Sequence, residues 1–376
     1  MSGKKSSKLI REIVRPAKQL GELVHRSASR VYSPYVYDLT ARKRVRMSPG
    51  ALELKNNVAI YVIAPFHGIW PSHLQALDFI VGSGIAPIVV SNLPLSANDK
   101  NDISDRAALI IERPNLGYDF GAFREGILHL RDRLEECSRV TLLNDSVWFP
   151  TPNASNWFES LDAQSSLFSG ATSNYGGSLK VPKSLEPEVW TYSPQANNFH
   201  YQSYAVSFSG RAIRDPAFLK FWTTYPLTNS KDLTVRRGEI GLSQWAISQG
   251  WSTSSTYPIE QMDLLVKPLS ESRLREIAER LIVLGNPEFL ALKHRVLKEK
   301  TDKESLRQMI LAAARCLGVA YATPEFNLRE MQFPFLKKSP VWHQKEASDI
   351  TLRIVREHGD RWGILEEVEF LRRSLP

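Results

Sequence analysis

Four short apolar segments, separated by helical segments, constrain the fold of this chain more than any other feature. Segments rich in valine, isoleucine and leucine cover residues 58–63, 88–90, 108–111 and 140–143. Strands that alternate with helices through connections of this length favour a parallel sheet with right-handed crossovers. The sequence therefore predicts an α/β fold with a doubly wound, mostly parallel sheet. Segments 167–171 and 204–208 predict further strands, less regularly spaced and suited to an antiparallel sheet edge.

A glycine-rich turn follows the third predicted strand. Gly117 and Gly121 let the backbone turn closely, and a helix beginning near Gly121 would direct amide groups toward an anion such as a diphosphate. Asp145 stands where the fourth strand leaves the sheet. Since ligands of open α/β sheets bind at the carboxyl ends of the strands, both segments are expected in one nucleotide-sugar crevice.

Polar side chains in these segments supply candidate donor contacts. Asn92, Asn115 and Asp119 could hydrogen-bond a base or ribose, and Arg113 or Arg124 could face phosphate. Two alternatives stay open. Asp119 could cap the local backbone, and Arg124 could be a solvated surface residue without an ion-pair partner.

The segment Asn144, Asp145, Ser146 is the candidate donor and metal motif. Mg²⁺ or Mn²⁺ bridging a diphosphate requires hard oxygen ligands, and Asp145 supplies one carboxylate where two are expected. The same three residues could simply cap the end of the strand. Metal-independent transfer therefore stays open.

Glu239 is the candidate catalytic base. We predict that it begins a helix that ends at Gly250 before a strand over residues 251–257. A carboxylate at a helix start is also stabilised by the helix dipole, which is the structural alternative. His200 and Gln202 could bind sugar hydroxyls, with Trp148 among the aromatic platforms, although a lone histidine is often a structural hydrogen-bonding residue.

Positive charge is concentrated at the N-terminus. Residues 1–48 contain twelve Lys or Arg and three acidic residues, a net charge of +9 in a chain whose total is +8. Apolar residues recur at helical spacing between Ile10 and Val24, with basic residues on another face. This basic amphipathic arm suits an anionic membrane surface, or it packs on the rest of the protein. Nucleic acid is disfavoured because the basic segment lacks stacking aromatics.

Composition places the chain among globular proteins of a reducing compartment. It has two cysteines, Cys137 and Cys316, and no apolar run near the roughly 18 residues of a membrane span. We also find no signal-peptide core, so a cytoplasmic protein is expected, peripheral on the inner face of the cell membrane if the arm binds there. After residue 265 helices replace strands, and Thr301 with Glu304 predicts a capping box. The predicted organisation is an arm and linker over 1–56, a nucleotide-sugar-binding domain over 57–265 and a helical C-terminal subdomain over 266–376.

Together these motifs resemble the rhamnan synthesis protein F family of glycosyltransferases. The matching segments are Ser72–Gly126, Leu143–Ser146, His200–Tyr204, Glu239–Ser243 and Phe333–Lys337. The resemblance spans about residues 57–340 and leaves out the basic arm. It implies a fold of the glycosyltransferase A type, with Asp145 in the donor or metal motif and Glu239 in the helix that carries the acceptor base. Asn144-Asp145-Ser146 departs from the usual Asp-x-Asp, and the Arg237-Gly238 entry to the Glu239 helix does not match.

The resemblance implies transfer of a deoxyhexose, typically rhamnose, from a nucleotide-activated donor. The acceptor would be a growing cell-surface polysaccharide or a lipid-linked glycan, and the reaction would invert the anomeric centre. The alternative is a catalytically silent component of a polysaccharide assembly complex that binds glycan or sugar nucleotide.

Overall fold

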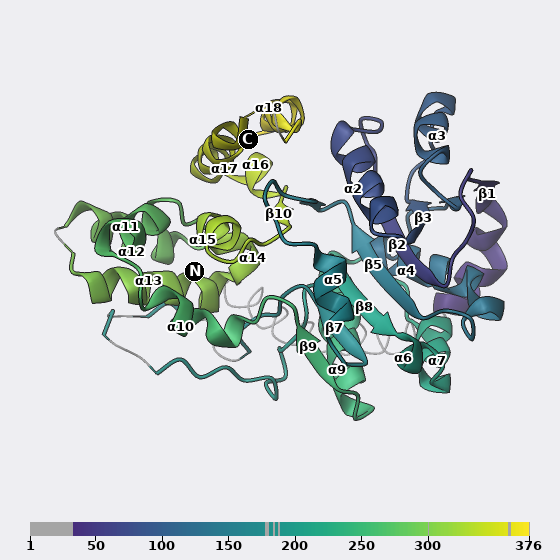
Figure 1. Ribbon diagram of the computed structural model, residues 1–376, viewed down its shortest axis with the longest axis horizontal. Helices are drawn as coiled ribbons and strands as arrows, with labels where there is room; N and C mark the ends of the chain where they lie inside the picture. The colour runs from purple at the N-terminus through teal and green to yellow at the C-terminus, as the bar shows by residue number, and fades with distance from the viewer. Residues whose placement is uncertain are drawn as a thin grey trace, which may run out of the picture.

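The protein is an α/β molecule with a large sheet on one side and a group of helices on the other (Figure 1). This computed structural model describes residues 33–176, 180–182, 185–186, 189–299, 301–359 and 362–375. Most of the basic amphipathic arm, including the apolar stripe from Ile10 to Val24, lies outside the described residues.

Eight strands of the described chain form one sheet in the order β1-β4-β3-β2-β5-β8-β7-β9. Their bounds are β1 Arg46–Pro49, β2 Asn57–Ile63, β3 Ala86–Ser91, β4 Leu109–Glu112, β5 Arg139–Asn144, β7 Phe168–Gly170, β8 Ala205–Ser209 and β9 Thr253–Ser255. β4, β3, β2 and β5 run parallel, and β8 is antiparallel to both β5 and β7. The predicted α/β class with a mostly parallel sheet is confirmed.

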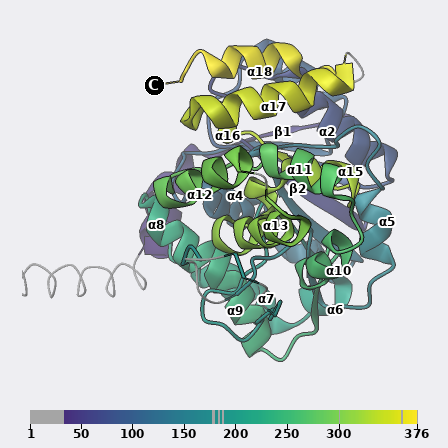
Figure 2. The same ribbon diagram turned by 90° about the vertical axis from the view of Figure 1, so that its left-hand side faces the viewer.

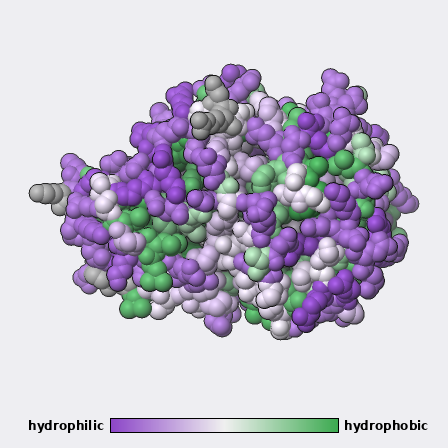
Figure 3. Space-filling model, viewed as in Figure 1, coloured by the Kyte–Doolittle hydropathy of each residue, from purple (hydrophilic) through white to green (hydrophobic). Residues whose placement is uncertain are grey.

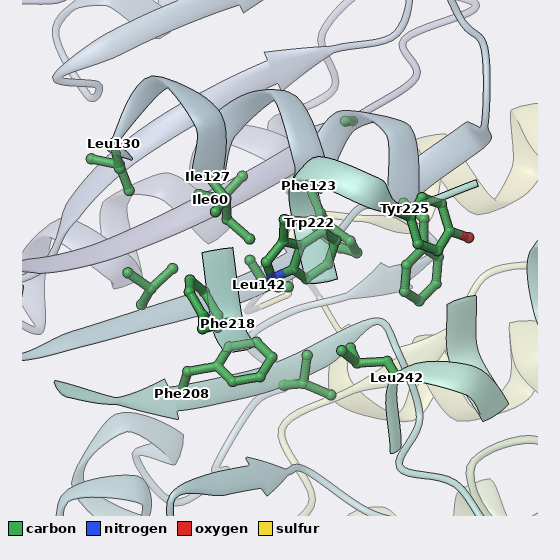
Figure 4. Close-up of a cluster of buried hydrophobic side chains, with 14 of the residues drawn as sticks. Ile60, Phe123, Ile127, Leu130, Leu142, Phe208, Phe218, Trp222, Tyr225 and Leu242 are labelled. Atoms are coloured by element: carbon green, nitrogen blue, oxygen red, sulfur yellow. The ribbon is translucent and has the colours of Figure 1, made fainter. Parts of the chain in front are cut away.

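Alternate residues of the central strands are buried on opposite faces of the sheet. Val58, Ile60 and Val62 pack into one apolar layer, while Ala59 and Tyr61 face the other. The first layer is covered by α4 Tyr118–His129, α6 Gly210–Ile213, α7 Pro216–Thr224 and α9 Gly241–Ser248. The second is covered by α2 Pro71–Gly82, α3 Ala97–Ser104 and α5 Trp157–Asp162. Figure 4 shows side chains of the first layer, including Phe123 of α4 and Trp222 of α7.

The structure corrects two strand predictions. β1 was not predicted, because its exposed polar residues and Pro49 give no apolar signal; it pairs antiparallel with β4 at the sheet edge. β8 is antiparallel as predicted for an edge, but it lies inside the sheet between β5 and β7.

Helices dominate the chain after β9, and those described form two large apolar clusters and a small third one around Ile350. The first cluster draws on α10 Met262–Val266, α11 Glu271–Glu279, α12 Pro287–Lys298, α13 Lys303–Leu317, α14 Val319–Ala322 and α15 Pro324–Arg329. The second draws on α16 Pro340–His343, α17 Lys345–His358 and α18 Leu365–Arg372, of which α17 and α18 lie side by side (Figure 2). The cap of α13 is Asp302, one residue after the predicted Thr301, because the Asp302 carboxylate accepts the Ser305 amide at 2.8 Å.

A two-stranded sheet joins the C-terminal helices to the large sheet. β10 Leu336–Lys337 pairs antiparallel with β6 Val147–Trp148, which directly follows β5. Thr151 adds to this connection, since its hydroxyl donates to the Phe333 carbonyl oxygen at 2.7 Å. Residues nearly 200 positions apart in the sequence therefore meet at the end of β5.

Residues 33–44 are helical and dock on α4 through buried charges. They include a π-helical turn, η1 Tyr37–Ala41, and a 3-10 turn, η2 Arg42–Arg44. Arg124, which was left open as a surface residue, is buried and forms a bidentate ion pair with Asp38 at 2.8 and 2.7 Å. Its guanidinium thus fixes this segment and does not face a phosphate.

The surface drawn in Figure 3 is mainly hydrophilic, with hydrophobic residues in separate patches. None of the helices in the described residues is both long enough and apolar enough to cross a membrane. Cys137 and Cys316 are buried, and no disulfide joins them.

Candidate active site

A cleft of about 970 Å³ opens between the carboxyl end of β5 and the C-terminal helices. Six of the predicted site residues line it: Asp119, Asn144, Ser146, His200, Gln202 and Glu239. They come from the start of α4, the end of β5, the segment before β8 and the helix before α9. The structure therefore brings the predicted donor and acceptor residues to one cavity.

The glycines of the predicted donor turn allow close backbone packing. Gly117 caps α4 with a φ of +85°, which favours glycine. A Cβ atom at Gly121 would lie 2.2 Å from the Leu116 carbonyl oxygen. Both glycines are therefore required by the geometry of the turn that begins α4.

Arg113 and Asn92 support this turn from inside the protein. Arg113 donates to the Asn92 side-chain oxygen at 2.5 Å and to the Leu116 carbonyl oxygen at 2.6 Å. Both side chains are buried and neither lines the cleft. Asn115 is exposed and also lies outside the cleft lining. The structure thus places three of the predicted donor-binding residues around the turn and away from the cavity.

The end of β5 is held by its own side chains. The Asn144 amide nitrogen donates to the Asp119 carboxylate at 2.9 Å, and its oxygen accepts the Ser146 hydroxyl at 2.6 Å. This is the capping arrangement that the sequence left open for Asn144. Asn144 and Ser146 also line the cleft, so capping and ligand contact are compatible.

Asp145 is not among the residues that line the cleft. Its carboxylate accepts the Ala64 amide at 2.8 Å and lies 3.4 Å from His73 Nε2, while His73 Nδ1 accepts the Trp70 amide. Burial alone would raise the pKa of Asp145, but the His73 hydrogen bond and charge, Lys338 and the Ala64 amide together lower it. Asp145 is therefore an ionised group that joins the ends of β2 and β5 to α2.

The contacts of Asp145 engage one oxygen of the predicted metal ligand. The Ala64 amide and His73 both approach Asp145 Oδ2, and the cleft lining does not include Asp145. Within the described ranges, no three His, Cys, Asp or Glu side chains gather as a metal site. The metal role of Asp145 therefore stays a prediction.

Asp119 is the acid on the donor side of the cleft. Burial, together with the Asp145 and Glu239 carboxylates, raises its pKa to about 7 against the opposing charges of Lys337 and Arg113. A carboxyl that is partly neutral near pH 7 repels an anionic ligand less than an ordinary aspartate does.

Glu239 lies on the opposite wall, but it does not begin a helix as predicted. The helix starts after Ser230, whose hydroxyl caps α8 Lys231–Thr234, and continues through a π-helical turn, η4 Val235–Ile240, into α9. Gly238 in this turn packs against Phe120, where a Cβ atom would lie 2.4 Å from the ring. Stabilisation by the helix dipole therefore does not explain Glu239, because this residue lies more than two turns inside the helical segment.

Glu239 is close to His200, one of the two polar residues predicted to bind sugar. Its carboxylate accepts the Ser203 amide at 3.2 Å and lies 3.8 Å from His200 Nε2. His200 Nδ1 is 2.8 Å from the Asn198 carbonyl oxygen, to which it donates. This contact leaves Nε2 facing Glu239 and the cleft. Hydroxyl groups of a sugar could bind Glu239, His200 and Gln202 together.

Trp148 is not an exposed platform. It is fully buried in the apolar cluster of the last helices, with Lys338 Nζ 5.7 Å from its ring centroid. Tyr204 lines the cleft instead.

The C-terminal residues of the cleft were missed by sequence reasoning. They include Arg315, Tyr321, Lys337, Trp342 and His343. The match of Phe333–Lys337 to the family was the one signal for this wall, and it gave no role to Lys337.

A mostly parallel α/β sheet with a polar cleft at the carboxyl end of its central strand is a ligand-binding architecture of open α/β proteins, and it is compatible with a glycosyltransferase-like protein. The family model described as rhamnan synthesis protein F matches residues 87–273, just under half of the chain, and confirms the family resemblance. The matched segment includes the start of α4, the end of β5 and Glu239.

A curated relative covers more of the chain. The uncharacterized protein y4gN of Sinorhizobium fredii is 28% identical over 307 residues, 81% of this chain and 76% of the relative.

Two solved mannosyltransferase structures are similar to this chain, with low TM-scores. Ktr4p from S. cerevisiae is 11% identical with a TM-score of 0.24, over 48% of this chain and 63% of that chain, so the match spans less than two thirds of the yeast structure. PcManGT from Pyrobaculum calidifontis, in complex with GDP-Man and Mn²⁺, is 11% identical with a TM-score of 0.28. That match covers 93% of this chain and 94% of the PcManGT chain. The fold assignment rests on the strand order of the sheet and not on these scores.

Proposed function

We propose that this protein transfers a deoxyhexose, rhamnose in the first instance, from a nucleotide-activated donor to a growing cell-surface polysaccharide or lipid-linked glycan. The observation that carries the proposal is the shared cleft, in which Asp119, Asn144 and Ser146 face the wall of Glu239, His200 and Gln202. The match to the rhamnan synthesis protein F family supports this substrate class.

We propose an inverting displacement with Glu239 as the general base. The acceptor hydroxyl would lose its proton to the Glu239 carboxylate while its oxygen forms a bond to the anomeric carbon. The bond from that carbon to the diphosphate oxygen breaks, and the nucleoside diphosphate leaves with the electron pair. The Ser203 amide and His200 support the proposal, because they hold Glu239 at the cleft wall.

Asp145 has a positioning role in this proposal and does not bind the donor itself. Its bonds to Ala64 and His73 fix the end of β5, from which Asn144 and Ser146 reach the cleft. No step of the proposed reaction runs through a divalent metal.

Glu239→Gln tests the proposal, because the amide keeps the size of the side chain and cannot accept the proton. We expect transfer to fall by about 10²-fold or more, with little change in donor affinity. The measurement is release of nucleoside diphosphate from candidate donors, with and without glycan acceptor. Exposed Glu53→Gln is the matched control. Undiminished turnover in Glu239→Gln would contradict the assignment, and donor binding without turnover in the parent protein would favour the silent binding component.

We further propose that the protein works at the cytoplasmic face of the cell membrane. An N-terminal patch of exposed residues supports this: Tyr35, Val36, Leu39, Lys43, Arg44, Arg46 and Met47. Apolar side chains beside clustered cations suit the headgroup region of an anionic bilayer. The patch continues from the basic arm.

A further inference from the structure

The chemistry proposed above leaves Lys337 without a role, although it lines the same cleft. Its position is fixed by β10, where Lys337 pairs with Val147 and the next amide, of Lys338, donates to the Ser146 carbonyl oxygen at 3.1 Å. The side chain therefore reaches the cleft beside the end of β5, on the proposed donor side.

Lys337 is a buried cation with a weak set of partners. Its exposed fraction is 7%, and its Nζ lies 4.1 Å from the ring centroid of Tyr204 and 5.0 Å from that of Tyr321. The Ser146 hydroxyl accepts its hydrogen bond at a long 3.4 Å. Across the described part of the chain, no carboxylate lies within ion-pair distance of Lys337.

The neighbouring lysine shows the contrast. Lys338 is equally buried, at 6%, but its Nζ lies 2.8 Å from the Glu367 carboxylate and 3.3 Å from the Ser72 hydroxyl. The fold therefore neutralises one of two adjacent buried ammonium groups with its own acid. The other faces a cavity of about 970 Å³.

Burying an ammonium group is costly unless an anion compensates it. Aromatic faces attract a cation but leave its net charge in place. A ligand that brings an anion to this point would recover the lost interaction in a poorly hydrated site, where charge pairing is strong. The ammonium, a hydroxyl and the adjacent strand end thus form a receptor for oxyanions.

We propose that Lys337 and Ser146 bind the diphosphate of the nucleotide-sugar donor and stabilise the charge that develops on it as it leaves. This inference rests on the proposed function and adds the cation that the reaction requires. The location favours the diphosphate, because Lys337 is beside Ser146 on the donor wall, while Glu239 occupies the opposite wall. Charge stabilisation by a fixed cation acts on the transition state more than on the bound donor.

Binding of nucleoside diphosphates tests this subsite. Calorimetric titration of the full chain with dTDP, UDP and GDP, each compared with its nucleoside, separates the contribution of the diphosphate from that of the base. We expect Lys337→Met to weaken binding of the preferred nucleoside diphosphate by about tenfold or more and to leave the nucleoside affinity unchanged. Lys337→Gln, which keeps a polar group, is expected to show the same selective loss.

Two other lysines provide controls. Lys55→Met removes an equal charge from an exposed site before β2 and is expected to leave both affinities unchanged. Lys338→Met breaks the buried pair with Glu367, so it is expected to lower the melting temperature while keeping the ratio of the two affinities. Thermal unfolding of every variant confirms that the protein remains folded.

The outcomes separate this inference from the proposed function. Nucleoside diphosphate affinity that is unchanged in folded Lys337→Met or Lys337→Gln overturns the subsite and leaves the transferase proposal standing. Equal loss of nucleoside and diphosphate affinity also overturns it, because the lysine would then shape the whole cleft. If none of the nucleoside diphosphates binds the parent protein, the proposed function fails together with the subsite.

Discussion

Asp119, at the start of α4, is influenced by both acidic and basic side chains. Its carboxylate accepts the Asn144 amide at 2.9 Å. Burial and the nearby acids Asp145 and Glu239 raise its pKa to about 7 from an ordinary value of 3.8, although Lys337 and Arg113 oppose the rise. Between about pH 4 and pH 7 the folded protein thus holds a proton that the unfolded chain releases.

This proton makes folding stability fall as pH rises through that window, since the folded state binds more protons than the unfolded state. Asp119→Asn removes the titration and keeps a side-chain oxygen for Asn144. We expect the variant to gain stability over the parent between pH 4 and pH 7, by roughly 1–3 kcal/mol in total. Urea unfolding at several pH values measures the difference. A constant difference across the window would show that Asp119 is charged throughout.

At this scale the sequence identified useful residues but did not reveal which way their side chains point. Asp119, Asn144 and Glu239 reach the cleft as predicted. Arg113 turns inward to Asn92 because the turn needs a donor for the Leu116 carbonyl oxygen. Such choices depend on contacts that form only after distant segments have packed.

Among the elements, the helix that carries Glu239 is the most unusual. It runs from Lys231 to Ser248 and widens over Val235–Ile240 into a π-helical turn. Turns of this kind are rare and are frequent at functional sites. Gly238 in the turn allows the Phe120 ring of α4 to pack against the backbone. The turn that carries Glu239 therefore packs directly against the helix of the donor wall.

Gly238→Ala tests this contact. The added Cβ atom would lie 2.4 Å from the Phe120 ring, so one of the two elements must shift. We expect a loss of about 1–3 kcal/mol in unfolding free energy, together with reduced transfer activity. Gly82→Ala at the end of α2 is the control, because nothing lies within 4 Å of its added Cβ atom. A Gly238→Ala variant as stable and active as the parent would rule out close packing here.

Element prediction succeeded where burial gives a clear pattern. β2, β3 and β5 are buried along their whole apolar length, so their sequences alone predict them. β1 failed because an exposed edge strand carries no such pattern. The predicted start of the Glu239 helix was wrong for two reasons. Ser230 and the polar turn that follows it lack an apolar period, and the glycine before Glu239 is a residue type common at helix boundaries.

For the whole molecule, the N-terminal patch raises the question of where the protein resides. The helical residues 33–44 are fixed to α4 by Asp38 and Arg124 and by Arg42 with Glu125 at 3.2 Å. Leu39 is nevertheless 70% exposed and Met47 57% exposed. A firmly docked segment that presents apolar and basic side chains to solvent is suited to an anionic surface.

Vesicle sedimentation tests membrane binding. We expect the protein to bind phosphatidylcholine vesicles that contain phosphatidylglycerol, to bind pure phosphatidylcholine much less, and to dissociate as salt increases. The combined variant Lys43→Ser, Arg44→Ser and Arg46→Ser should lose about 1 kcal/mol of binding per removed charge.

The control for this experiment removes three exposed lysines elsewhere, Lys55→Ser, Lys220→Ser and Lys267→Ser. It is expected to bind nearly as the parent does. If both variants weaken binding equally, net charge explains the binding and the N-terminal patch does not.

The sequence predicted the fold class and the donor side of the cleft, but not the cleft as a whole. Its walls come from Ser146, Glu239 and Lys337, which are far apart in the chain. Ser146 and Lys337 meet through the pairing of β6 with β10. A pairing of two residues per strand leaves no recognisable pattern in a sequence. The contribution of the C-terminal helices to the cleft was therefore invisible before the structure.

The contact between Gly238 and the Phe120 ring also has an evolutionary consequence. A side chain at position 238 fits only if position 120 becomes smaller, since both compete for the same space. Among relatives that keep this helix, substitutions at the two positions are expected to occur together. Relatives in which residues 120 and 238 have changed together would then be those in which the two walls of the cleft keep the same spacing.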